Sequence, residues 1–153
     1  MRVFIVFTSL WLGFLAASSN AAEASASIGD GRTRITLTAS ERDYVLAGMR
    51  EHVSHIQSIV DALAADDRRR AQAVALEAGS RHFLELTDHP PGLAGKWPEA
   101  WKFMLRARLQ SFDALAQGIQ DGETTSQSLK RLSTAMQTCT ACHAAFRLTS
   151  DHQ

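Results

Sequence analysis

The stretch Cys139-Thr140-Ala141-Cys142-His143, close to the C-terminal end, decides how the rest of the chain is interpreted. It is a Cys-x-x-Cys-His motif, the attachment signature of a c-type haem. Two thiols in this order can add to the two vinyl groups of a haem, and the adjacent imidazole can take an axial position on the iron. The motif therefore predicts one haem c bound through Cys139 and Cys142, with His143 as an iron ligand.

Three other interpretations of the two cysteines stay open at this point. A thioredoxin-like redox pair requires a strand before it and a helix after it, but no strand pattern precedes Cys139. A zinc site requires more Cys or His at ligand spacing, and the other histidines are scattered. A structural disulfide would leave His143 without a role. A haem-free thiol protein is thus the alternative to a cytochrome.

Residues 1–22 have the pattern of a signal peptide. Arg2 supplies a positive start, residues 3–17 are apolar, and small residues up to Ala22 offer a cleavage site. The run is shorter than the ~20 apolar residues of a membrane span, which favours a removed signal over a retained anchor. We expect a periplasmic protein with no membrane span after signal removal. Residues 23–37 are rich in Ala, Ser and Gly and are expected to be a flexible leader.

Composition narrows the classes of function. The chain of 153 residues has the length of one domain. Its 16 basic and 16 acidic residues balance, so the total predicts no broad basic surface for nucleic acid. No catalytic triad, paired carboxylate or phosphate-binding loop is visible. We therefore do not expect an enzyme.

Residues 38–150 are expected to form four helices, because proline occurs only at positions 90, 91 and 98 and the only alternating stretch is brief, at residues 34–37. The first helix begins near Thr38, where Glu41 completes a capping box. The other expected boundaries are about Asp67 to Thr87, Trp97-Pro98 to Gly122, and a start at Thr124 to Ser126. Short connections favour an all-α, antiparallel four-helix bundle.

Apolar periodicity predicts which side of each helix faces inward. In the first helix the expected inward row repeats at intervals of three and four: Leu46, Met49, Val53, Ile56, Val60 and Leu63. In the last helix the corresponding row is Leu129, Leu132, Met136, Cys139, His143 and Phe146. The second and third helices are expected to bury Ala71, Val74, Ala75, Ala78, His82, Phe83 and Leu86, and Trp97, Trp101, Met104, Leu105, Phe112, Leu115 and Ile119. This arrangement predicts a haem buried among the helices.

These features resemble class II cytochrome c, the cytochrome c prime family, over roughly residues 38–148. The resemblance rests on Arg42, Leu46-x-x-Met49, Trp97 with Phe103, and Cys139-x-x-Cys-His143-x-x-Phe-Arg147. The stretch between the second and third helices is shorter than in many members. The family implies an exported four-helix bundle with one covalent haem near the C-terminus.

The resemblance also implies that the residue opposite His143 comes from the first helix. High-spin members place an apolar side chain there, which leaves the iron free to bind nitric oxide or carbon monoxide. Low-spin members place a methionine there, which suits electron transfer. Met49 is therefore the expected sixth ligand, and Leu46 is the expected distal-pocket residue of the alternative. Arg42 and Arg147 are candidate partners of the haem propionates.

Other potential iron ligands fit less well. His52 and His55 lie off the expected inward row and are assigned to the surface. Met104 and Met136 are assigned to the core, the second because it lies on the same helix as His143. The sequence thus predicts a carrier of single electrons between periplasmic donor and acceptor proteins, with a gas-binding protein as the alternative. It leaves open whether the protein is a monomer or a homodimer.

Overall fold

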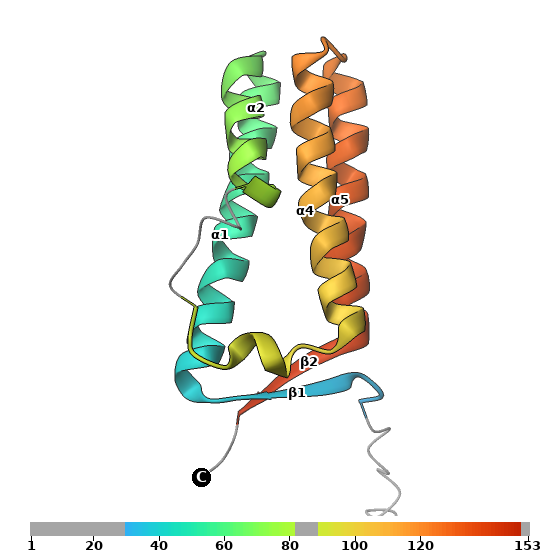
Figure 1. Ribbon diagram of the computed structural model, residues 1–153. Helices are drawn as coiled ribbons and strands as arrows, with labels where there is room; N and C mark the ends of the chain where they lie inside the picture. Colours follow the sequence, from blue (N-terminus) through green and yellow to red (C-terminus); the bar gives the residue numbers. More distant parts are fainter. Residues whose placement is uncertain (1–29, 82–88, 151–153) are drawn as a thin grey trace, which may run out of the picture. The chain divides into compact units, whose positions relative to one another are not determined.

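The computed structural model describes residues 30–81 and 89–150, and the fold is stated for these residues. The chain divides into two units, Met1–Asp30 and Gly31–Gln153, and all helices and strands described here belong to the second. Its helices are α1 (Ala39–Ala64), α2 (Arg68–Glu77), the 3-10 helix η1 (Leu93–Lys96), α4 (Glu99–Gln120) and α5 (Thr125–Ala145) (Figure 1). The expected signal peptide, residues 23–29 of the leader, and residues 82–87 of the expected second helix, with His82, lie outside the described residues. The expectation that the second helix runs without a break to Thr87 is wrong, because α2 ends at Glu77 with Ala78 as its C-cap.

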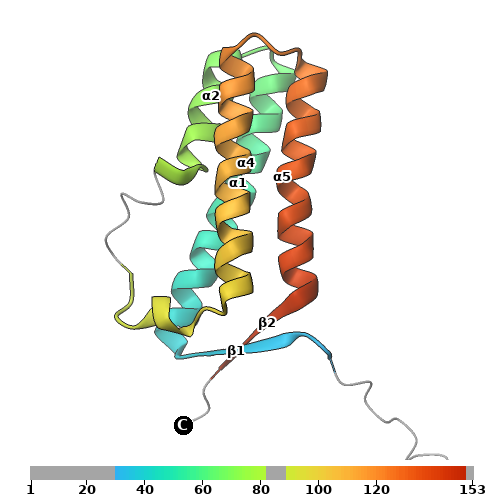
Figure 2. The ribbon, with the colours of Figure 1, turned by 45° about the vertical axis from the view of Figure 1, so that its right-hand side comes forward.

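The predicted helical bundle is confirmed at the level of its four α-helices, which lie side by side (Figure 2). α1 packs mainly on α2, and α5 mainly on α4, while α2 and α4 join the two pairs. None of the helices within the described residues is long and apolar enough to cross a membrane.

Two capping boxes start the helices where the sequence predicts. At α1, the Glu41 backbone N–H donates to Thr38 Oγ1 (3.3 Å), and the Thr38 N–H donates to Glu41 Oε2 (2.7 Å). At α5, Thr124 and Gln127 make the same reciprocal pair. These bonds satisfy backbone donors that the first helical turn leaves unpaired.

Helix ends also follow from local sequence. Gly122 closes α4 at φ 84°, a left-handed conformation in which glycine is favoured. The Glu123 N–H then donates to the Gly118 carbonyl (3.0 Å). Pro98 is the N-cap of α4, one position before the first turn where the sequence places it. Its missing N–H costs nothing there, because no helical bond is required of that residue.

A strand pair is the main departure from the all-α expectation. β1 (Thr33–Leu37) pairs in parallel with β2 (Phe146–Ser150), with Thr33 opposite Phe146 and Leu37 opposite Ser150. The last five residues of the expected leader are therefore a strand. Within β1, the side chains of Ile35 and Leu37 are buried, with 2% and 0% of their surface exposed. The strands cross one end of the bundle (Figures 1 and 2).

Buried side chains form two separate clusters. The larger one joins α1, α2, α4 and α5: Ile59, Ala62, Leu63, Ala71, Ala75, Ala78, Phe112, Leu115, Ala116, Ile119, Leu132 and Ala135. The smaller one lies under the strands: Ile35, Leu37, Leu93 and Phe146, with half-buried neighbours including Trp97, Trp101, Met104 and Cys142. The inward sides predicted for α4 and for the described part of the second helix agree with these clusters, except at Leu105, which belongs to neither.

The predicted inward rows of α1 and α5 are partly wrong. Val53 and Val60 are 66% and 41% exposed, and Leu129 and Met136 are 42% and 43% exposed. A strict seven-residue repeat drifts around a straight helix by about 20° per repeat, so such a row does not stay on one face. Because α1 packs on α2 and α5 packs on α4, the side of each helix away from its partner is left open.

Candidate functional site

The Cys-x-x-Cys-His motif occupies the last turns of α5. Cys139 and Cys142 are half-buried free thiols. Burial is the main cause that raises the pKa of Cys142. A thioredoxin-like nucleophile requires the opposite, a lowered thiol pKa, and the segment before Cys139 is helix rather than strand. The geometry therefore argues against that alternative.

A pocket of about 270 Å³ opens beside the motif. Its lining comes from α1, α4, α5, β2 and the residue before β1: Arg32, Arg42, Leu46, Met49, Trp101, Cys142, His143, Phe146, Arg147 and Leu148. Every site residue proposed from sequence except Cys139 lies on this list, although the positions span residues 42–147. Their individual roles stay predictions, but one pocket brings them together.

The apolar row had indicated that His143 lies on the buried face of α5, but it does not. Its side chain is exposed at the pocket. Met136 precedes it by seven residues on the same side of the helix and is also exposed. This side faces away from the α4 contact, and the pocket continues from His143 to Leu46 and Met49 on α1.

Three arginines border the pocket. Arg42 and Arg147 were candidates from sequence, whereas Arg32 was not. Arg32 donates from Nη1 to the His143 carbonyl (3.2 Å), which links the start of β1 to the motif. Nothing in the Ala-, Ser- and Gly-rich leader marks Arg32; its only signal is its place two residues before the brief alternating stretch. Guanidinium groups bind carboxylates bidentately, so this border suits a ligand that carries carboxylates.

Aromatic side chains close the pocket toward the strands. The Trp101 ring lies edge-on to Phe146, with ring centroids 5.6 Å apart. Trp97 stacks on Trp101 at 4.8 Å. The pocket thus has an apolar wall beside its arginine border.

The sequence analysis assigned His52 and His55 to the surface, but neither is a surface residue. Both are half-buried, and their Nδ1 atoms are buried without a hydrogen-bond partner among the described residues. Burial, followed by the nearby charges of Arg108 and His55, lowers the pKa of His52 to about 3. The inward face of α1 therefore carries imidazoles where the predicted row placed Val53.

The pKa of His52 gives a pH prediction. The unfolded chain binds a proton at His52 below pH 6.5, whereas the folded protein binds it only near pH 3. Stability should therefore fall between these values by up to about 1.4 kcal/mol per pH unit as pH decreases. Urea unfolding of His52→Gln at pH 7 and pH 5 should show a smaller loss than the wild type.

The control is His55→Gln, which removes the neighbouring imidazole from the same helix. This variant is expected to keep the acid-dependent loss of stability. Equal losses in the wild type and in His52→Gln would contradict the assignment.

A larger pocket, about 480 Å³, lies between α2 and α4. It contains none of the residues predicted for the site. Its wall is held by Asp113, whose carboxylate accepts from the Ser80 N–H (3.0 Å) and from the Ser80 hydroxyl. This contact joins the segment that follows α2 to α4.

The residues beside the motif fit a haem. Within residues 30–81 and 89–150, no three His, Cys, Asp or Glu side chains gather as a metal site. A haem needs no such group, because its ring supplies four nitrogens and the protein adds only axial ligands. The pocket offers His143 and Met49 as axial donors, Cys142 at the attachment motif, and arginines for carboxylates.

Comparisons of the chain with protein-family models, with curated proteins and with solved structures returned no match. The motif and the geometry of this pocket are therefore the features that bear on function.

Proposed function

We propose that the protein is an exported monohaem c-type cytochrome of the class II type, which carries single electrons between periplasmic redox partners. The haem is held through Cys139 and Cys142, with His143 as axial ligand. One observation carries the proposal: the pocket that contains Cys142 and His143 also contains Leu46, Met49 and Arg42 from α1. An antiparallel order of the helices is part of this proposal, and the short connections between α1 and α2 and between α4 and α5 support it.

Met49 is the proposed sixth ligand. It shares the pocket with His143 although the two lie on different helices. A bound haem would supply one-electron chemistry, and methionine–histidine ligation favours a high potential. Arg42, Arg147 and Arg32 would hold the propionates, while Trp101 and Phe146 would keep water from one side.

The visible spectrum of the oxidised protein tests the assignment of Met49. We expect a methionine-to-iron charge-transfer band that disappears in Met49→Leu. Met104→Leu is the matched control, because Met104, on α4, is also a half-buried methionine and packs against the cluster under the strands. This control should keep the band. A band that survives in Met49→Leu would contradict ligation by Met49.

The second candidate function is a gas-binding protein with five-coordinate iron. It is favoured by Leu46, which lines the same pocket and would leave the distal side apolar. A high-spin wild-type spectrum, unchanged in Met49→Leu, together with binding of carbon monoxide to the ferrous protein, would support this function instead.

A further inference from the structure

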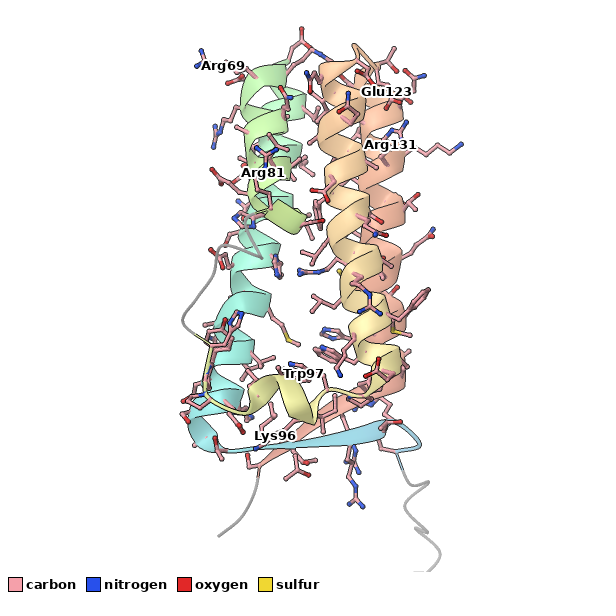
Figure 3. All side chains as sticks on the ribbon, viewed as in Figure 1. Arg69, Arg81, Lys96, Trp97, Glu123 and Arg131 are labelled. Atoms are coloured by element: carbon pink, nitrogen blue, oxygen red, sulfur yellow. The ribbon has the colours of Figure 1, made fainter. Side chains whose placement is uncertain are left out.

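Within the described part of the chain, Arg108 is a buried cation without an acidic partner. It lies on α4 and is 9% exposed, the only buried arginine or lysine among the described residues. The salt bridges found in that part of the chain are Lys96–Glu41, Lys102–Glu99 and Arg131–Glu123, and none includes Arg108. Figure 3 shows the Glu123–Arg131 pair at one end of the bundle and Lys96 near the other. A buried charge is normally paired, because burial removes its hydration.

The surroundings of Arg108 place it beside the proposed haem. Arg108 lies one turn after Met104 on α4, and Met104 packs in the same cluster as Cys142. Two turns before Arg108, on the same side of the helix, is Trp101, which lines the pocket. Burial is the main cause that lowers the pKa of Arg108, and Cys139 and Cys142 act on that pKa in the opposite direction. On the other side, Arg108 acts on His52 of α1. It therefore lies between the attachment thiols and the helix that carries Met49.

Neutral polar atoms accompany this cation. The buried Nδ1 atoms of His52 and His55 lack partners among the described residues, and the two rings lie 6.0 Å apart. A guanidinium and two imidazoles thus gather between the two hydrophobic clusters. Polar groups in such a setting are costly unless another group compensates them.

We propose that Arg108 is a fixed internal cation that raises the reduction potential of the haem; this inference rests on the proposed function. Loss of one electron leaves the ferric haem with one more positive charge than the ferrous haem. A cation held nearby disfavours that added charge, and the protein interior screens it less than water does. Arg108 is a positioning residue in this sense, since it acts on the iron without binding it.

The test is a potentiometric titration of the haem-loaded protein, followed by its visible spectrum. Arg108→Gln removes the charge and should shift the ratio of oxidised to reduced protein about tenfold toward oxidised, a fall of about 59 mV for one electron. Arg108→Lys keeps the charge and should stay near the wild-type potential. Arg106→Gln is the matched control, because Arg106 is exposed on the same helix, and it should change the potential little.

Arg108→Met serves as a second charge-free variant if Arg108→Gln does not fold. An unchanged potential in a haem-loaded charge-free variant would overturn the inference and leave the proposed function intact. A lowered potential in Arg108→Lys equal to that in Arg108→Gln would also overturn it, because the charge would then not be the cause. A wild-type protein without bound haem would overturn the proposed function first.

Discussion

Replacing Cys139 and Cys142 together by serine is expected to abolish covalent haem attachment completely. In the proposed attachment each thiol would form one thioether bond to a vinyl group, so neither bond could form in the double variant. Each single variant should keep one bond and a reduced yield of attached haem. Staining a denaturing gel for haem measures the outcome, because only covalently bound haem migrates with the chain.

The control for this experiment is Thr140→Ala. Thr140 lies between the two cysteines, is exposed, and donates its hydroxyl to the Gln137 carbonyl (2.9 Å). It supplies no atom to the proposed attachment, so haem should remain bound. Haem on the double cysteine variant would contradict the assignment, and an unstained wild type would favour the haem-free thiol protein.

Leu37→Ala is expected to lower the free energy of unfolding by about 2–5 kcal/mol. Leu37 is a fully buried residue of β1 and forms one cluster with Ile35, Leu93 and Phe146. Truncation removes apolar contacts and leaves a cavity that a two-stranded sheet closes only in part. Urea unfolding at neutral pH measures the change through its midpoint and slope.

Thr36→Ala is the matched control because Thr36 is on the opposite, exposed face of β1. Its hydroxyl shares a hydrogen bond with Thr149 (3.2 Å), and loss of one exposed bond should cost no more than about 1 kcal/mol. Equal effects of Leu37→Ala and Thr36→Ala would show that β1 is not part of the stable core.

The helices were predictable because their signals are local. Thr38 with Glu41, Thr124 with Gln127, and Gly122 each act within a few residues, and each lies where the sequence indicated. The strand pair was not predictable in this way. Its partners Thr33 and Phe146 are far apart in the chain, and a four-residue alternating stretch does not reveal its partner.

The candidate site was predicted in part, for a related reason. The motif and the resemblance indicated Leu46, Met49 and His143, and one pocket contains all three. They did not indicate Arg108, because a buried arginine has the same sequence signal as its exposed neighbour Arg106. His52 was misplaced because the predicted row on α1 assumed a strict repeat, whereas the helix turns its inward face along its length.

The intact mass of the wild-type protein, measured under denaturing conditions, tests covalent haem attachment at Cys139 and Cys142. Attachment predicts a mass that exceeds that of the polypeptide by one haem, because two thioether bonds survive denaturation. A mass equal to the polypeptide alone, from a host shown to attach haem to another c-type cytochrome, would contradict covalent haem at Cys139 and Cys142.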